Sequence, residues 1–316
     1  MLHGAFANGR YTSTVLVVLS MLVFVAAYWL PVSSYAVGHP SAMGGVVSHI
    51  LSVLLYFLSA FVLSRQSFFD SNVRWKGALY LWFAALSTFV NGGAAMAFVA
   101  FLFLLSFVLL FFAQNCAEPT GPLFTSFMLL GVQAFVAPCS IWFIPLFLLF
   151  CYMTNTLSVR GVAASFLGLL TPFWLVLGTA YVFPAANSIT ESFLTGLPVI
   201  FDVEFPAFSL LNVLLLLFVL AVLLPSLFLF VGSSSPAKPM LRRRLSFVAV
   251  ACVYMLLLSL VIGGGAHFFY ICQLPFVAIL ASYVLARKET KLLNLYFVVL
   301  NVLMSAVATY QLWWNN

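Results

Sequence analysis

Long apolar runs alternate with short polar breaks along the whole chain. A helix needs a run of about 20 apolar residues to cross a bilayer, and continuous runs favour helices because transmembrane strands alternate apolar and polar positions. The pattern therefore predicts an all-α fold, a polytopic transmembrane bundle of eleven helices. The predicted spans are 12–30, 45–63, 77–90, 94–113, 122–137, 139–153, 162–182, 208–231, 246–262, 268–285 and 292–312.

Two pairs of predicted spans, within 77–113 and 122–153, include unusually short members: 77–90, 122–137 and 139–153. Turn signals separate the members of each pair: Asn91–Gly93 in the first and Pro138 in the second. Spans of about 14 to 16 residues reach only about 21 to 24 Å, whereas the hydrocarbon core is about 30 Å thick. Two interpretations stay open. Each pair is either a re-entrant hairpin that lines a cavity or a full crossing that the bilayer accommodates by thinning.

The basic residues predict the orientation of the chain. With eleven spans, all twelve Lys and Arg residues fall on one side. Because positive loops stay in the cytoplasm, the N-terminus is predicted to be cytoplasmic and the C-terminus to be outside. The net charge of +6 then reflects topology and gives no indication of nucleic-acid binding, which needs a solvated basic face. Arg242, Arg243 and Arg244 precede the ninth span and are predicted to contact anionic lipid head groups.

The composition excludes an ordinary soluble domain. Apolar residues make up 65% of the 316 positions and charged residues 6%, whereas soluble proteins average about 45–50% and 25%. The whole chain, 1–316, is therefore predicted to be a single integral membrane domain in contact with the lipid bilayer. The five cysteines are scattered and form no CxxC pair. They are interpreted as small apolar residues, and neither a metal nor a cofactor is predicted.

One long outer loop, about residues 184–207, carries half of the acids in the chain. Asp202 and Glu204 are two residues apart, so an extended backbone would place both carboxylates on one side. Paired carboxylates can act as a base and an electrostatic clamp. They are candidate catalytic residues together with His267, which follows the glycine run Gly263–Gly265 at the outer end of the tenth span. The alternative is that these acids only keep the loop solvated.

The polar residues inside the predicted spans are mostly uncharged. Gln133, Asn212 and Gln273 are candidate substrate-binding residues, because amides can bond polar groups without carrying a charge. Their alternative role is hydrogen bonding between helices. No Asp, Glu, Lys or Arg lies unambiguously in the middle of a span, which counts against a proton pump or an ion-coupled carrier with buried carboxylates.

The segment from Val159 to Phe173 contains the string Ser165-Phe166-Leu167-Gly168-Leu169-Leu170-Thr171-Pro172-Phe173. Together with the Gly131–Pro138 hairpin, the basic loop near 238–244 and the Gln273-Leu274-Pro275 start of the tenth span, it resembles a widespread, uncharacterised family of bacterial multi-pass inner-membrane proteins, classed as a domain of unknown function. The resemblance covers most of the chain and implies a location in the bacterial inner (cytoplasmic) membrane. It implies no established activity, cofactor or catalytic residue.

The same helix pair, the cytoplasmic N-terminus and the number of helices are also similar to those of polytopic glycosyltransferases that use polyprenyl-phosphate sugars. Those enzymes carry an acidic base in the first outer loop. Here that loop, residues 31–44, holds no Asp or Glu. The resemblance therefore implies at most a degenerate transferase, in which Asp202 or Glu204 would have to serve instead.

Three classes of function follow from these patterns. Architecture favours the handling of a lipid-linked or glycan precursor in the bacterial envelope, with or without catalysis. The first alternative is a permease or flippase for an amphiphilic substrate, which the short Pro-broken pairs favour. The second alternative is a non-catalytic membrane scaffold. An outward-facing cavity at the acids would support the first class, and a midplane cavity at the amides would support the permease.

Overall fold

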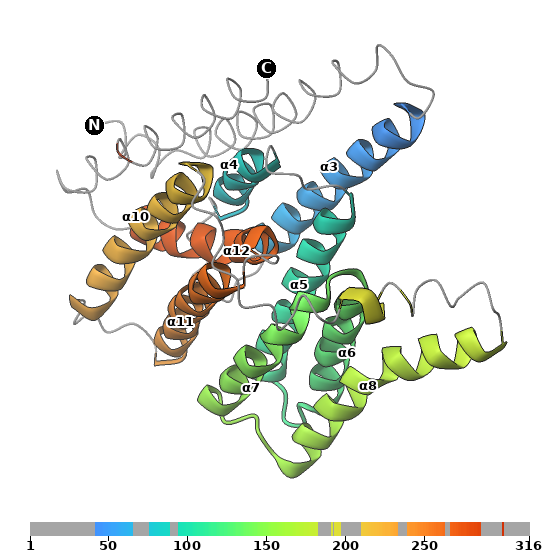
Figure 1. Cartoon of the computed structure of the whole chain (residues 1–316). Helices are drawn as coiled ribbons and strands as arrows, with labels where there is room; N and C mark the ends of the chain where they lie inside the picture. The colour runs from blue at the N-terminus through green and yellow to red at the C-terminus, as the bar shows by residue number, and fades with distance from the viewer. Residues whose placement is uncertain are drawn as a thin grey trace. The chain divides into compact units, whose positions relative to one another are not determined.

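The computed structural model describes residues 42–65, 76–88, 94–182, 191, 193–196, 210–232, 239–262, 266–285 and 299. These residues are almost entirely helical (Figure 1), which confirms the all-α prediction for this part of the chain. The helices are α3 (Ala42–Arg65), α4 (Lys76–Thr88), α5 (Ala94–Ala113), α6 (Thr120–Val136), the 3₁₀ helix η1 (Pro138–Trp142), α7 (Phe143–Met153), α8 (Val159–Val182), α10 (Leu210–Gly232), α11 (Pro239–Val261) and α12 (Ala266–Leu285).

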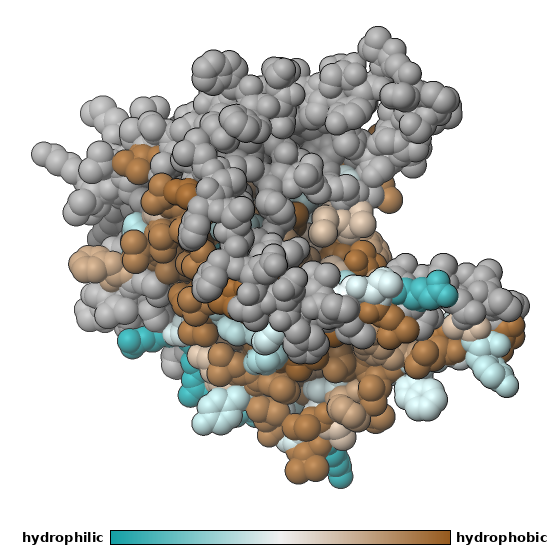
Figure 2. All heavy atoms as spheres, in the orientation of Figure 1, coloured by the Kyte–Doolittle hydropathy of each residue, from teal (hydrophilic) through white to brown (hydrophobic). Residues whose placement is uncertain are grey.

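Three of these helices are long and apolar enough to cross a membrane. They cover Ala95–Ala113 in α5, Val159–Val182 in α8 and Arg242–Val261 in α11. Apolar side chains also dominate the visible face of the described part, while hydrophilic ones lie towards its margins (Figure 2). Both observations support a membrane protein, because such a surface is costly in water. The first and last predicted spans, 12–30 and 292–312, lie outside the described residues apart from Val299.

The contacts divide the chain into two compact units. The first, which we call the α10 unit, comprises residues 1–97, 207–256 and 273–316. The second, the α5–α8 unit, comprises residues 98–206 and 257–272. One integral domain over residues 1–316 stays a prediction.

In the α10 unit, aromatic ring contacts connect α3, α4 and α10. Helix α3 packs on α4, where the rings of Tyr56 and Tyr80 lie 6.3 Å apart. Helix α4 in turn contacts α10 through an edge-to-face pair of rings, Phe83 and Phe218, at 5.0 Å. Aromatic pairs at these separations add to the dispersion energy of burial. This unit is therefore a packed group of helices and not a string of separate spans.

In the α5–α8 unit, α5 and α7 run parallel. The ring of Phe103 lies 4.3 Å from that of Phe143, at the start of α7, and the ring of Phe111 lies 4.9 Å from that of Phe150, near its end. Contacts that advance together along two helices show that the helices point the same way. Edge-to-face packing between Phe127 of α6 and Phe147 of α7, at 5.8 Å, extends this aromatic core across the unit.

Helices α6 and α8 are also parallel, and they approach closely at glycines. A Cβ on Gly161 would lie 3.1 Å from Leu123 Cδ1, and a Cβ on Gly131 would lie 3.1 Å from Pro172 Cγ. Gly168 meets the Phe124 carbonyl group with no room for a Cβ. Small residues at a helix interface allow backbones to approach, as is common between membrane helices. Successive crossings by α5, α6, α7 and α8 require these two parallel pairs.

Two boundaries differ from the predictions. The predicted span 139–153 is a 3₁₀ helix over Pro138–Trp142 followed by α7, because Pro138 lacks the N–H that would continue α6 and favours the first position of a new helix. The predicted span 246–262 begins earlier, at Pro239, so that the arginine cluster belongs to the helix itself. Arginine is a good helix former, and a proline again occupies the first position.

Candidate functional site

The α6–η1 junction contains two buried polar side chains whose hydrogen-bonding groups have no partner among the described residues. Gln133, a predicted substrate-binding residue, lies one turn before the end of α6 and is fully buried. Neither its Nε2 nor its Oε1 atom has a hydrogen-bond partner in this part of the chain. Buried polar groups in folded proteins almost always have one. The Gln133 amide is therefore the most unusual feature of the described structure.

Ser140, which the sequence analysis did not single out, is the second member of this junction. It lies in η1, is fully buried, and its Oγ likewise has no partner among the residues described. The backbone connects it to Gln133 in two steps. The Ala137 N–H donates to the Gln133 carbonyl oxygen at 2.8 Å, and the Ser140 N–H donates to the Ala137 carbonyl oxygen at 2.9 Å. This bonded turn holds both side chains at the same end of α6.

Helix geometry gives Gln133 a different face of α6 from the one that meets α8. Ser126 lies seven residues before Gln133, which is two turns, so the two side chains share a face. The Ser126 Oγ donates to the Ser106 carbonyl oxygen of α5 at 2.7 Å. The glycine contact with α8 is made by Gly131, on another face of α6. The Gln133 amide thus belongs to the side of α6 that is directed at α5.

Other buried serine hydroxyl groups of this unit do make hydrogen bonds, unlike that of Ser140. The Ser106 Oγ donates to the Phe103 carbonyl oxygen at 2.8 Å, and the Ser165 Oγ donates to the Gly161 carbonyl oxygen at 2.9 Å. Serine and threonine commonly bond a carbonyl one turn earlier in a helix. Ser140 departs from this rule, and the Gln133 amide beside it in the chain also has no partner among the described residues.

The junction is uncharged in the described residues of the α5–α8 unit. Glu118, Arg160 and Glu191 are the acidic and basic residues described there, and all three are exposed. No group of three or more His, Cys, Asp or Glu side chains in the described ranges is arranged to hold a metal ion. The available chemistry is hydrogen bonding to a neutral group.

The other predicted amides have different surroundings. Gln273, in α12 of the α10 unit, is fully buried, and its Nε2 donates to the Cys252 carbonyl oxygen of α11 at 2.8 Å. Its Oε1 has no partner among the described residues. This amide therefore joins two helices, which was its alternative role in the sequence analysis. Asn212 lies in the first turn of α10, but its side chain is outside the described part.

The predicted catalytic residues are not brought together in the described structure. Asp202 and Glu204 lie outside the described residues. The backbone of His267 lies in the first turn of α12, and its side chain is outside the description. The catalytic set of Asp202, Glu204 and His267 therefore stays a prediction.

The predicted lipid-contacting arginines occupy the first two turns of α11. Arg242 and Arg243 are exposed, in keeping with contact to a head group. Arg244 is 8% exposed and is therefore a buried residue of the α10 unit. A helix turns by about 100° per residue, so three consecutive arginines cannot all share one face.

Comparison with known proteins gives no relative. No family model matches the chain, and no curated protein or solved structure matches it. The resemblances to the bacterial inner-membrane family and to the polyprenyl-phosphate-sugar glycosyltransferases stay predictions.

Proposed function

We propose that this chain is a multi-pass protein of the bacterial inner membrane that binds the polar part of an amphiphilic molecule within its helix bundle, as a permease or flippase does. Eleven spans, a cytoplasmic N-terminus and an external C-terminus belong to the proposal. The parallel pairs α5–α7 and α6–α8 support successive crossings by these helices, and the positions of the basic residues favour this orientation. The exposed Arg242 and Arg243 at the start of α11 then lie at the cytoplasmic surface, where anionic head groups are available.

The surface of α8 supports contact with lipid. Gly161 and Gly168 of α8 are buried where they approach α6. Large apolar residues of α8 point outward: Trp174 is 73% exposed, Leu175 63% and Tyr181 92%. The polar groups on this surface are satisfied within the helix, since the Thr171 Oγ1 donates to the Leu167 carbonyl oxygen at 2.7 Å. A helix in lipid needs such internal bonding because hydrocarbon offers no partner.

The single observation that carries substrate binding is the Gln133 amide. An amide without partners costs about 1–3 kcal/mol for each buried group, and more in a membrane, where water is absent. A bound polar group would offset this cost. An envelope precursor that joins a sugar to a lipid is one substrate of this type, and the catalytic version of the proposal would use Asp202, Glu204 and His267.

Co-purified lipids test the proposal. The protein is extracted in its native membrane with a styrene–maleic acid copolymer, and its bound lipids are identified by mass spectrometry. We expect an amphiphile enriched over the bulk membrane in the wild type and depleted in Gln133→Met, which keeps the side-chain length and removes the amide. The matched control is Thr125→Val, also in α6, whose hydroxyl already donates to the Gly121 carbonyl oxygen at 3.0 Å. Equal enrichment in all three proteins would contradict the proposal.

A further inference from the structure

We propose that Gln133 and Ser140 form a site for an uncharged hydroxyl group of the bound amphiphile. This inference rests on the proposed function and adds to it the chemical class that the site accepts. It is based on the depth of the α6–η1 junction, on the donors and acceptors that the junction presents, and on the charges around it.

The junction lies beside the middle of α8 and not beside the C-terminal end of that helix. Near the end of α6, the ring of Phe135 contacts that of Phe173 at 4.9 Å. Helix α8 continues from Phe173 to Val182, nine residues or about 14 Å, through the exposed Trp174 and Tyr181. If α8 crosses the membrane over its whole length, the α6–η1 turn lies well inside the bilayer. Unpaired polar groups are most costly there.

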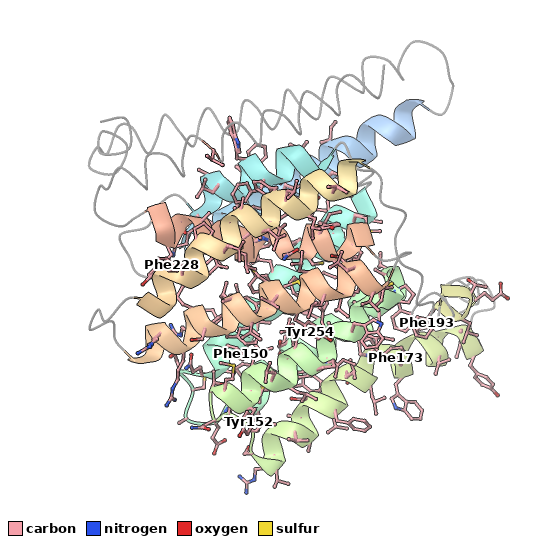
Figure 3. All side chains as sticks on the ribbon, turned by 60° about the vertical axis from the view of Figure 1, so that its left-hand side comes forward. Phe150, Tyr152, Phe173, Phe193, Phe228 and Tyr254 are labelled. Atoms are coloured by element: carbon pink, nitrogen blue, oxygen red, sulfur yellow. The ribbon has the colours of Figure 1, made fainter. Side chains whose placement is uncertain are left out.

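A nearby segment covers the α8 side of this turn. The ring of Phe193 lies 5.4 Å from that of Phe173 and 5.2 Å from that of Phe135, and Figure 3 shows Phe173 and Phe193 side by side. A Cβ on Gly196 would lie 2.8 Å from Pro138 Cγ. The chain therefore returns to the turn after α8. The aromatic trio therefore lies on the α8 side of α6, whereas the Gln133 amide is on the side directed at α5.

The donors and acceptors of the junction match a hydroxyl group. The Gln133 Nε2 carries two N–H donors and its Oε1 is an acceptor, while the Ser140 hydroxyl can do either. A hydroxyl group on a ligand can accept from Nε2 and donate to Oε1 at the same time. A carboxylate or phosphate offers only acceptors, and an ammonium only donors, so each would leave part of the amide unpaired.

The charges described around the junction also disfavour an ionised ligand group, for a second reason. The charged residues described in the α5–α8 unit, Glu118, Arg160 and Glu191, are exposed, so none of them is buried beside the junction as a counter-ion. A buried charge without a partner is far more costly than a buried hydroxyl. The site therefore favours a neutral alcohol or sugar hydroxyl over a charged head group.

Photolabelling with matched probes tests the site directly. The purified full-length protein in lipid nanodiscs is irradiated with an eight-carbon alcohol that carries a diazirine, and with the carboxylate of the same chain length. We expect saturable labelling of residues 133–142 by the alcohol and little by the carboxylate. Gln133→Met should lower the saturable labelling about tenfold or more, and Ser140→Ala about two- to tenfold, since one neutral hydrogen bond contributes about that factor. Thr125→Val should leave it unchanged.

The outcomes separate the site from the proposed function. If the alcohol labels nothing between 133 and 142, the junction holds at most water, and the inference is wrong. Equal labelling by the carboxylate, or labelling that Gln133→Met leaves unchanged, also overturns it. Saturable alcohol labelling that depends on Gln133 supports the site even if no amphiphile co-purifies, in which case only the proposed function fails. A thermal unfolding transition like that of the wild type shows that the Gln133→Met protein is folded.

Discussion

At the scale of single residues, Gln133 and Gln273 differ in one measurable respect. Both are fully buried amides, but only Gln273 makes a side-chain hydrogen bond to another described residue. Replacing an unpaired buried polar group by an apolar group of the same shape is neutral or stabilising, whereas losing a formed hydrogen bond costs about 0.5–1.5 kcal/mol. The two amides should therefore respond differently to the same substitution.

We expect Gln133→Met to stabilise the ligand-free protein, by about 1–3 kcal/mol at most, and Gln273→Met to stabilise it less or to destabilise it. The measurement is unfolding in mixed micelles with increasing sodium dodecyl sulfate, followed by tryptophan fluorescence. A Gln133→Met protein that unfolds more readily than Gln273→Met would mean that the Gln133 amide is satisfied in the folded protein.

The sequence alone indicates part of this contrast. An amide in an apolar run can be recognised as unusual, and Gln133 and Gln273 were selected on that basis. Which of them finds a carbonyl group depends on the face of a neighbouring helix, and no local pattern encodes that. Ser140 was missed because a serine in an apolar run normally bonds its own helix. Here it lies in a 3₁₀ helix that follows a proline.

At the scale of helices, the glycines of α8 divide into two kinds. A Cβ on Gly168 would collide with the Phe124 carbonyl group of α6, whereas a Cβ on Gly178 would meet no described atom within 4 Å. The sequence identifies both as glycines in a span, but their roles follow from which side of α8 meets α6. The predicted helix ends were mostly correct, since apolar periodicity and prolines determine them locally. The close packing of α6 on α8 is non-local and was not predicted.

These two glycines provide a matched pair of substitutions in one helix. Gly168→Ala should destabilise the protein by about 1–3 kcal/mol, because α6 and α8 have to move apart. Gly178→Ala should be neutral or stabilising by up to about 1 kcal/mol, because alanine is the better helix former and the site is open. The same detergent unfolding measures both. Equal effects of the two substitutions would contradict the close α6–α8 contact.

At the scale of the whole molecule, charge and hydropathy predict an orientation of the chain in the membrane, which helix packing alone does not determine. Alternating directions for α5, α6, α7 and α8 are compatible with either orientation in the membrane. Only the cost of moving Lys and Arg through hydrocarbon selects one of them. The predicted cytoplasmic loops include the segment between α5 and α6, residues 114–119, and the segment between α7 and α8, which leads to the exposed Arg160.

The native cysteines allow this membrane orientation to be tested with only one or two substitutions. Cys116, in the loop between α5 and α6, is exposed, whereas the other four cysteines are buried. A membrane-impermeant maleimide should therefore label Cys116 in inverted vesicles and leave it unlabelled in intact spheroplasts. Cys116→Ser should abolish the signal in inverted vesicles. Adding Glu191→Cys, an exposed position in the predicted outer loop, to Cys116→Ser should produce labelling in spheroplasts. Labelling of Cys116 in spheroplasts would reverse the orientation and place the arginines of α11 outside.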